Sequence, residues 1–265
     1  MELSVVGCHG GETPKHKTCG FVVAAGRGRR AASLALDAGS LASGLTIEQQ
    51  SALGVVLVSH AHLDHVKELA TLVDNRCQAG APPLVVAGNA ATIRALKKHF
   101  FNNLMWPDFS KIPSAKKPTF VYEVLPAEKP VVVAGFEIQA VPVTHTIDCS
   151  GFIVRAQGQA GALAYSGDTG PTDRFWELLD ETSDLRAALV EVSFPDEQQR
   201  LSTTSGHHTP KTLARDLAKL ERHAHLPIFA YHMKPVYQPS IERQLARLRT
   251  GHELFVMRLG DEIGI

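Results

Sequence analysis

The sequence predicts an α/β protein built from many short strands and fewer helices. Apolar, β-branched runs of about four to eight residues recur along the whole chain, and glycine-containing turns separate them. Other segments place their apolar residues at helical spacing. Because strands and helices alternate without a linker, an internal repeat or a low-complexity stretch, we expect a single domain over residues 1–265.

The first half of the chain is expected to begin with strands and then to alternate. Strand-like runs occupy 2–7, 19–25, 33–37, 54–58 and 83–87. Gly10-Gly11, Gly26 and Gly39 punctuate them. The run at 54–58 is apolar throughout, which is typical of a buried strand. Helical patterns follow at 65–74 and 89–101.

The second half continues the alternation. Strands are expected at 119–125, 131–134, 136–143, 151–156, 162–166, 186–192 and 227–231, and helices at 172–182, 210–223 and 239–249. The helix at 210–223 has the clearest start, because Thr209 can cap it and Pro210 takes its first position. Three leucines follow at helical spacing and are expected in the core: Leu213, Leu217 and Leu220.

The most informative stretch runs from His60 to His65, directly after the strand at 54–58. His60 and His62 are two residues apart, so in extended chain they project to the same side. Asp64 and His65 fall where the chain curls into the next helix and can point elsewhere. Imidazole and carboxylate bind zinc, manganese or iron, and this split suits two adjacent ions better than one. A polar surface loop is the alternative, but it does not explain three histidines at the mouth of a buried strand.

Composition limits which partners and which cellular compartment are expected for this chain. The chain is 44% hydrophobic and 20% charged with a formal net charge of +0, so bulk charge demands neither nucleic acid nor membrane. Two basic spots, Arg27-Gly28-Arg29-Arg30 and Lys116-Lys117, are interpreted as solvated loops. The four cysteines form no Cys-x-x-Cys pair and fit reduced thiols. Without a signal-peptide pattern or a long apolar run, a cytoplasmic protein is expected.

The His-x-His-x-Asp-His run at 60–65 resembles the signature of the metallo-β-lactamase superfamily. The resemblance implies a four-layer αββα sandwich with the site along one edge, between two sheets. It covers most of the chain, because later motifs occur in the expected order. One departure is Glu68, where many relatives carry glycine. That residue changes helix packing or surface charge and leaves the ligands intact.

The resemblance also implies two divalent metal ions, zinc first, with manganese or iron as alternatives. His60, His62 and His145 would hold one ion, Asp64, His65 and His232 the other, and Asp168 would bridge them. His145 and His232 each follow a predicted strand, as His60 does. Asp168 has glycines on both sides in the run 166–170, but it could instead cap the helix that starts near Pro171.

Six motifs in order narrow the resemblance to the class II 3′,5′-cyclic-nucleotide phosphodiesterases: 60–65, 99–108, 167–170, 190–195, 206–210 and 232–235. In that family a histidine at the position of His207 faces the scissile phosphate without binding metal. A polar loop residue is the alternative, and His208 is expected at the surface. Asn102 and Trp106 would line the substrate pocket, although core packing is an equally good explanation for Trp106.

The sequence therefore predicts a dinuclear-metal phosphodiesterase that hydrolyses cAMP and/or cGMP to 5′-nucleotides through a metal-bridging hydroxide. Asp64 and His207 are the expected catalytic residues: Asp64 orients the ions, and His207 stabilises developing charge or protonates the leaving alkoxide. The alternatives are a tRNA 3′-processing endonuclease, another hydrolase of this fold, or a non-catalytic nucleotide sensor. A small cyclic nucleotide, but no membrane and no nucleic acid, is the expected partner, and a homodimer is left open.

Overall fold

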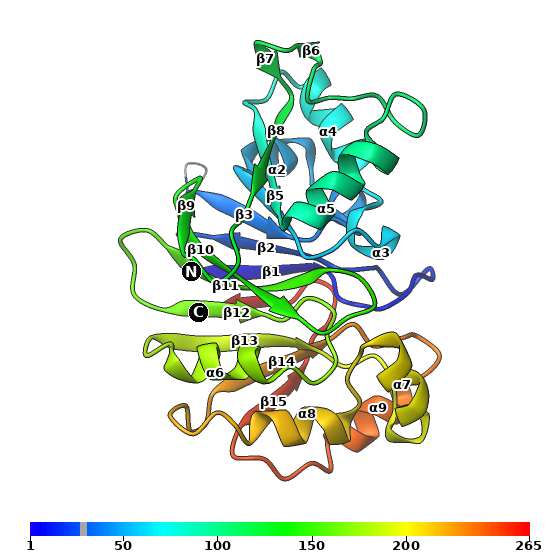
Figure 1. Cartoon of the computed structure of the whole chain (residues 1–265), viewed down its shortest axis with the longest axis vertical. Coiled ribbons are helices and arrows are strands. Elements are labelled where there is room, and N and C mark those ends of the chain that lie inside the picture. The colour runs from blue at the N-terminus through cyan, green and yellow to red at the C-terminus, as the bar shows by residue number, and fades with distance from the viewer. Residues whose placement is uncertain (27–30) are drawn as a thin grey trace.

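Two facing β-sheets form the centre of the molecule, as the computed structural model shows for residues 1–26 and 31–265 (Figure 1). Each sheet has seven strands within these described residues, and a two-stranded ribbon stands apart. The basic spot Arg27-Gly28-Arg29-Arg30 lies outside the described residues.

The first sheet combines an antiparallel half with a parallel half. β1, β2 and β3 pair antiparallel, whereas β3, β4, β5 and β8 run parallel. In spatial order its strands are β16 (Glu262–Gly264), β1 (Glu2–Gly7), β2 (Gly20–Ala24), β3 (Ser33–Leu36), β4 (Val55–Val58), β5 (Leu84–Gly88) and β8 (Phe120–Val124).

The second sheet has the same mixed character. β9 to β12 pair antiparallel, and β12, β13, β14 and β15 run parallel. In spatial order its strands are β15 (Glu253–Val256), β14 (Pro227–Tyr231), β13 (Leu185–Glu191), β12 (Ala162–Tyr165), β11 (Cys149–Ala156), β10 (Phe136–Val143) and β9 (Val131–Val133).

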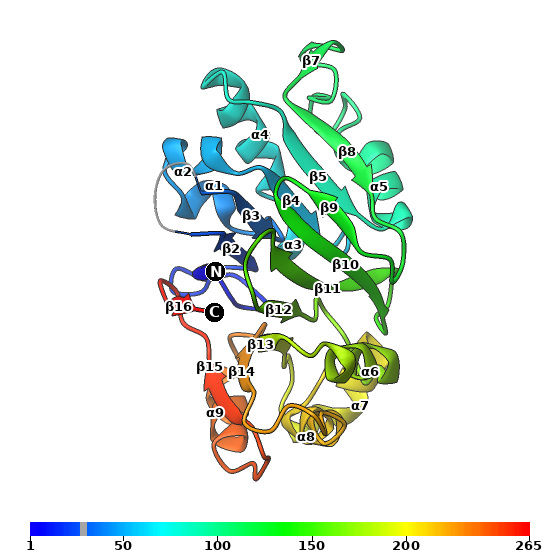
Figure 2. The same cartoon turned by 90° about the vertical axis from the view of Figure 1, so that its left-hand side faces the viewer.

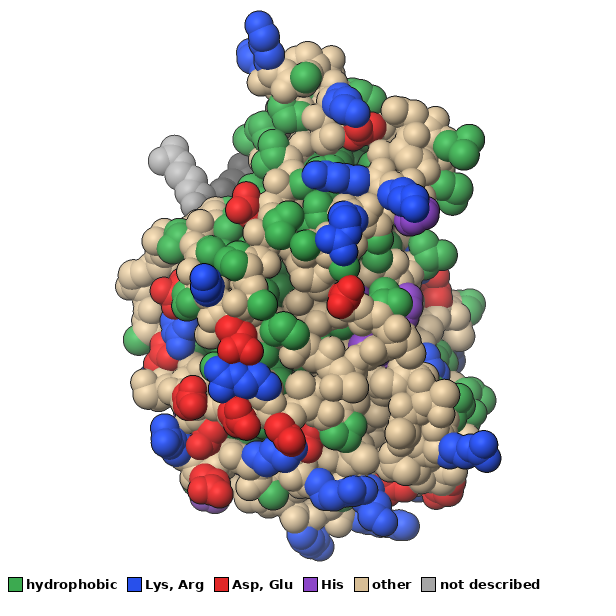
Figure 3. All heavy atoms as spheres, in the orientation of Figure 1, with side chains coloured by type: hydrophobic (Ala, Val, Ile, Leu, Met, Phe, Trp, Pro, Cys, Tyr) green, Lys and Arg blue, Asp and Glu red, His purple; other side chains and the backbone are tan. Residues whose placement is uncertain are grey.

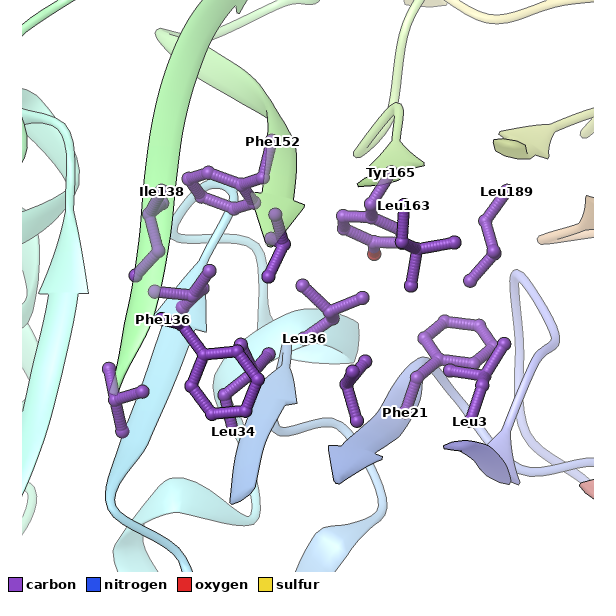
Figure 4. Close-up of a cluster of buried hydrophobic side chains, with 14 of the residues drawn as sticks. Leu3, Phe21, Leu34, Leu36, Phe136, Ile138, Phe152, Leu163, Tyr165 and Leu189 are labelled. Carbon is purple, nitrogen blue, oxygen red and sulfur yellow. The ribbon is translucent and has the colours of Figure 1, made fainter. Parts of the chain in front are cut away.

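The main hydrophobic core lies between the two sheets. Alternate residues of a strand point to opposite faces, so Leu3 and Val5 of β1 are buried while their neighbours are half-buried. Figure 4 shows Phe21 and Leu36 of the first sheet facing Tyr165 and Phe152 of the second. Close packing of these aromatic and branched side chains fixes the sheets relative to each other, and thereby fixes the edge where the site lies.

Helices cover the outer face of each sheet, which completes four layers (Figure 2). The αββα sandwich that the resemblance implied is therefore confirmed. The helices over the first sheet are α1 (Leu41–Gly44), α2 (Ile47–Ala52), α3 (Leu63–Val66), α4 (Leu69–Gln78), α5 (Ala90–Ala95) and the π-helical turn η1 (Leu96–Phe100). Those over the second sheet are α6 (Asp173–Glu181), η2 (Asp196–Gln198), α7 (Gln199–Ser205), α8 (Pro210–Leu217) and α9 (Gln238–Leu245). Among the described residues, no helix combines the length and hydrophobicity needed to cross a bilayer.

Two predicted helices differ from the structure for identifiable reasons. The helix expected at 65–74 is split into α3 and α4, because the Glu68 N–H donates to the Ala38 carbonyl at 3.0 Å. The Glu68 carboxylate also accepts from the Ser43 N–H at 2.8 Å, so this residue ties α1 to the α3–α4 junction. The helix expected at 210–223 ends at Leu217, yet Leu220 is buried as predicted. The capping box at Thr209 and Pro210 in the first turn are confirmed.

The elements that the sequence analysis missed are short or lie at edges. They include α1, α2 and α7, the ribbon β6 (Pro113–Ser114) and β7 (Lys117–Pro118), and the edge strands β15 and β16. The edge strands β15 and β16 have only four and three residues, which is too short for a clear alternation of apolar and polar residues.

Candidate metal centre

Several candidate site residues lie just past the carboxyl ends of strands, along one edge of the sandwich. Asp37 follows β3, and His60 and His62 follow β4. His145 follows β10, Asp168 follows β12, and His232 follows β14. Because parallel strands end at the same edge of a sheet, the crevice outside their carboxyl ends collects side chains from distant parts of the sequence.

Three histidines form the first cluster, His60, His62 and His145, with ligand atoms within 4.8 Å of one another. Nδ1 of His62 lies 2.9 Å from Nε2 of His60 and 3.3 Å from Nε2 of His145. These are the residues predicted to hold one ion.

The second cluster adjoins the first and consists of Asp64, His65, Asp168 and His232. Nε2 of His65 lies 3.3 Å from Nε2 of His232 and 3.3 Å from Oδ2 of Asp168. The same Asp168 oxygen is 3.8 Å from Nε2 of His60, so Asp168 contacts both clusters. This is the position that a bridging carboxylate requires.

Hydrogen bonds behind the first cluster fix which ring nitrogens carry protons. The Ser59 hydroxyl donates its only proton to Oδ2 of Asp37 at 2.8 Å, so it can only accept from Nδ1 of His60, 3.0 Å away. Nδ1 of His145 faces the Gly206 carbonyl at 2.9 Å and must donate to it. Nε2 of His60 and Nε2 of His145 are therefore left with lone pairs directed toward His62.

The second cluster follows the same rule. Nδ1 of His65 donates to Oδ2 of Asp37 at 2.7 Å. The Ser193 hydroxyl donates to Glu191 at 2.9 Å, so Nδ1 of His232, 2.8 Å away, donates to Ser193. When both rings are neutral, the two Nε2 atoms that face each other both carry lone pairs, which repel unless a proton or a metal ion lies between them.

The donor set fits divalent metal ions. Burial lowers the pKa of His60 and of His145, which keeps both rings in the neutral, metal-binding form. Burial opposes charge on His65, but Asp168 and Asp37 outweigh it and raise the pKa of that ring. Oδ1 of Asp168 is buried without a hydrogen-bond partner among the described residues. Converging lone pairs, an unpartnered carboxylate oxygen and a preference for positive charge are what a metal centre satisfies.

Asp37 is a positioning residue to which the sequence analysis assigned no role. Its backbone has a φ of +57°, and its buried carboxylate accepts from the Ser59 N–H at 2.8 Å and the Tyr165 hydroxyl at 2.5 Å. Through Ser59 it orients His60, and directly it orients His65, so one carboxylate supports both clusters. The aspartate at a strand end, in 36–40, was the available signal.

We expect Asp37→Asn to weaken metal binding about 10- to 100-fold, because an amide nitrogen would face groups that now donate to a carboxylate. Competition against a chromophoric chelator measures the affinity. Asp173→Asn, at an exposed carboxylate, is the matched control. Equal affinity for the Asp37 variant and the control would show that this carboxylate does not orient the ligands.

His207 lies beside both clusters, although the sequence left open a role as a polar loop residue. Its ring centroid is 4.9 Å from that of His145 and 5.5 Å from that of His232. Nδ1 donates to Oε1 of Glu191 at 2.7 Å. Burial alone would lower the pKa of His207, but Glu191 raises it. His207 is therefore a buried side chain held by a buried carboxylate and not a solvated loop residue.

Glu191 was not assigned a role from the sequence, and His208 was misplaced. Besides His207 and Ser193, the Glu191 carboxylate accepts from the Thr169 N–H at 3.1 Å. His208 was predicted at the surface, which is wrong: it is fully buried. Its Nδ1 lies 3.0 Å from the Thr212 hydroxyl, because the first turn of α8 packs inward.

The two predicted substrate-binding residues lie in a separate loop, after η1. The Asn102 side chain accepts from the backbone of Leu104 and Met105 and donates to the Lys98 carbonyl, so it closes its own turn. Trp106 is half-buried against the hydrophobic cluster under α4 and α5, as the packing alternative expects. Neither belongs to the clusters of metal-binding groups within the described residues, and their contact with substrate stays a prediction.

Because Trp106 packs against the hydrophobic cluster, its replacement should lower the stability of the protein. We expect Trp106→Ala to lower the free energy of unfolding by about 2 kcal/mol, less than for a fully buried tryptophan, and Tm by roughly 4–8 °C. Hydrolysis of a cyclic nucleotide and of a small aryl phosphodiester should then change alike. An unchanged Tm with a selective rise in KM for the cyclic nucleotide would instead establish base binding.

Comparisons with known proteins agree with this fold. The family model described as "Beta-lactamase superfamily domain" matches residues 36–229. A Yersinia pestis protein called a probable 3′,5′-cyclic-nucleotide phosphodiesterase is 28% identical over 235 residues, 77% of this chain and 66% of that protein. A Caenorhabditis elegans zinc phosphodiesterase, an ELAC protein 2 homolog, is 27% identical over 240 residues, 78% of this chain and 28% of that protein.

Among solved structures, unliganded yeast PDE1 superimposes with a TM-score of 0.85 at 18% identity, covering 98% of each chain. At that identity the likeness concerns the fold. The match with the Yersinia protein spans just under two thirds of that protein's length.

Proposed function

From the premise that the chain belongs to the β-lactamase superfamily, we propose that it is a metal-dependent phosphodiesterase that hydrolyses 3′,5′-cyclic nucleotides to 5′-nucleotides. The observation that carries the proposal is a pair of adjacent His/Asp clusters joined by Asp168, with His207 beside them. The name of the Yersinia relative supports this choice of substrate.

The proposed metal ligands are those of the two clusters. His60, His62 and His145 would hold one divalent ion, and Asp64, His65 and His232 would hold the other, with Asp168 next to both clusters. When bound, such ions neutralise charge on a phosphodiester and make water acidic enough to supply a nucleophile near neutral pH. Nitrogen and carboxylate ligands favour zinc, with manganese or iron as alternatives.

The protein's own contribution is rigid positioning. Hydrogen bonds buried behind the clusters hold three histidines: Asp37 orients His60 through Ser59 and accepts directly from His65, and Ser193 accepts from His232. Asp64 lies on the open side, where its Oδ2 is 3.4 Å from Nε2 of His232, and the side chain is 32% exposed. Among the proposed ligands, Asp64 is one of the partly exposed ones, which suits a residue that orients both ion and substrate.

His207 supplies the proton. Because Nδ1 is committed to Glu191, the proton that moves is the one on Nε2. The Glu191 carboxylate favours the charged ring, so His207 can donate to the departing 3′ oxygen of the ribose as the P–O bond breaks. Transfer of that proton avoids the release of a high-energy alkoxide.

A tRNA 3′-processing endonuclease is the second candidate, favoured by the similarity to the Caenorhabditis elegans zinc phosphodiesterase. It would use the same clusters and the same extra histidine. The interval between His145 and Asp168 contains β11, β12 and a short connection, with no inserted arm that would hold RNA at the site.

One comparison of substrates tests the proposal. Zinc- or manganese-loaded protein is incubated with cAMP, cGMP, a precursor tRNA and a small aryl phosphodiester. We expect turnover of at least one cyclic nucleotide and of the aryl ester, with the tRNA left intact. Cleavage of the tRNA with inert cyclic nucleotides would replace the proposal with the second candidate. Asp168→Ala, prepared in parallel, controls for a contaminating hydrolase.

A further inference from the structure

One end of the molecule is formed by a strongly basic segment, residues 94–117. Residues 94–117 contain six Lys or Arg and one acid, Asp108, whereas the whole chain has a net charge of +0. All six basic residues are exposed: Arg94, Lys97, Lys98, Lys111, Lys116 and Lys117. Asp108 is already paired with Lys111 at 2.8 Å. Figure 3 shows several basic side chains at the upper end of the molecule with few acidic ones beside them, and a mixture of basic and acidic side chains lower down.

An apolar tip projects from this basic end. Leu104 is 88% exposed and Met105 66% exposed, in the loop between η1 and β6. Leu104 has the largest exposed fraction among the large hydrophobic side chains of the described residues. Exposure of two adjacent apolar residues costs free energy in water, so a contiguous apolar tip marks a surface for binding.

Hydrogen bonds hold the tip in its outward position. Oδ1 of Asn102 accepts from the backbone N–H groups of Leu104 at 2.9 Å and Met105 at 2.8 Å. Asn103, with a φ of +63°, donates its N–H to the Trp106 carbonyl at 2.9 Å and accepts from the Asp108 N–H at 2.9 Å. A turn built in this way is organised before binding, which lowers the entropy cost of a contact.

An apolar tip surrounded by basic side chains fits an anionic membrane better than it fits a second copy of the chain or a nucleic acid. Anionic lipid headgroups match the lysines, and the hydrocarbon boundary beneath them accepts Leu104 and Met105. A symmetric contact with a second copy would bring two basic surfaces together, which Coulomb repulsion disfavours. Nucleic acid would leave the apolar tip in water, and the tip offers bases no exposed aromatic ring.

We propose that this end of the protein docks reversibly on an anionic membrane surface, with Leu104 and Met105 in the interface and the six basic residues over the headgroups. The proposal revises the expectation of no membrane partner and the interpretation of Lys116-Lys117 as a merely solvated loop. It is independent of the proposed function, because docking uses none of the residues in the two metal clusters.

Co-sedimentation with lipid vesicles tests the proposal on the intact protein. We expect binding to vesicles of phosphatidylcholine mixed with phosphatidylglycerol, weak binding to phosphatidylcholine alone, and release by salt. Replacing both tip residues, Leu104→Ser with Met105→Ser, should lower the partition coefficient about tenfold or more. Val132→Ser, at a 57% exposed valine of β9, is the matched control and should have no effect.

Charge is tested separately. Lys116→Glu with Lys117→Glu should lower partitioning by at least about twentyfold, because each basic residue near an anionic surface contributes about fivefold. Arg247→Glu with Arg249→Glu makes the same change in net charge after α9 and should have a small effect. A thermal melt of each variant checks that it is folded. If the double variant at Leu104 and Met105 destabilises the loop, the double variant at Lys116 and Lys117 still tests the proposal.

Four results would overturn the proposal. The first is absence of wild-type binding to the anionic vesicles, and the second is equal loss in test and control variants. The third is a dimer, seen by light scattering without lipid, that the tip variant converts to a monomer. The fourth is binding to a single-stranded oligonucleotide that is lost in the lysine variant while vesicle binding remains.

Discussion

Asp168→Ala is expected to abolish nearly all hydrolysis and to release or displace at least one metal ion. The Asp168 side chain is almost fully buried, and its Oδ2 lies 3.3 Å from Nε2 of His65, 3.4 Å from Nε2 of His232 and 3.8 Å from Nε2 of His60. No other carboxylate among the described residues contacts histidines of both clusters. Loss of its charge should lower kcat by roughly 10²–10³-fold or more, and metal content per chain should fall in elemental analysis.

Asp173→Ala provides the control, since that carboxylate is exposed and pairs only with Lys219 at 2.6 Å. A variant at Asp168 that retains two ions and full activity would remove the bridging assignment. A variant that retains folding but no ions would show that the two metal positions bind cooperatively.

His207→Ala should separate proton transfer from metal binding. Because His207 is additional to the proposed ligands, we expect both ions and the fold to be retained while kcat falls by roughly 10²-fold or more. KM should change little. An aryl phosphodiester with an acidic leaving group needs less protonation, so its hydrolysis should fall by a smaller factor than that of a cyclic nucleotide.

Glu191→Gln is a second test of proton transfer by His207. It removes the carboxylate that raises the pKa of His207, so the basic limb of the kcat profile should move to lower pH. If His207→Ala loses metal instead, His207 is a ligand, and either His145 or His232 must leave the proposed set. Equal loss on both phosphodiesters would argue for charge stabilisation rather than proton donation.

The strands and the candidate ligands were predictable because they depend on local sequence. An unbroken apolar, β-branched run such as 54–58 favours a buried strand, and the residues that follow such a run lie where the strands of the sheet end. His60, His145 and His232 were each recognised in this way, and the structure brings their side chains into two adjacent clusters. The order of motifs then supplied the αββα sandwich, which local patterns alone do not determine.

Long-range hydrogen bonds were not predictable. Asp37 supports His60 and His65 only because β3 and β4 are parallel neighbours, and Glu191 supports His207 only because β13 ends beside the loop before α8. His208 was misplaced because a polar residue at a helix start usually faces water, whereas here the capping turn is buried. Trp106 stays open: the fold packs part of its ring against the hydrophobic cluster under α4 and α5, and contact with substrate remains a prediction.

The most direct test of the account is the identity of the product formed from cAMP in oxygen-labelled water. If the two clusters hold ions that direct water to phosphorus while His207 protonates the 3′ oxygen, the zinc- or manganese-loaded protein will yield 5′-AMP with the label in the phosphate. A chelator will stop the reaction, and added metal will restore it. Formation of 3′-AMP, an unlabelled phosphate, or no product from either cAMP or cGMP by protein that carries its full metal content would contradict the central claim.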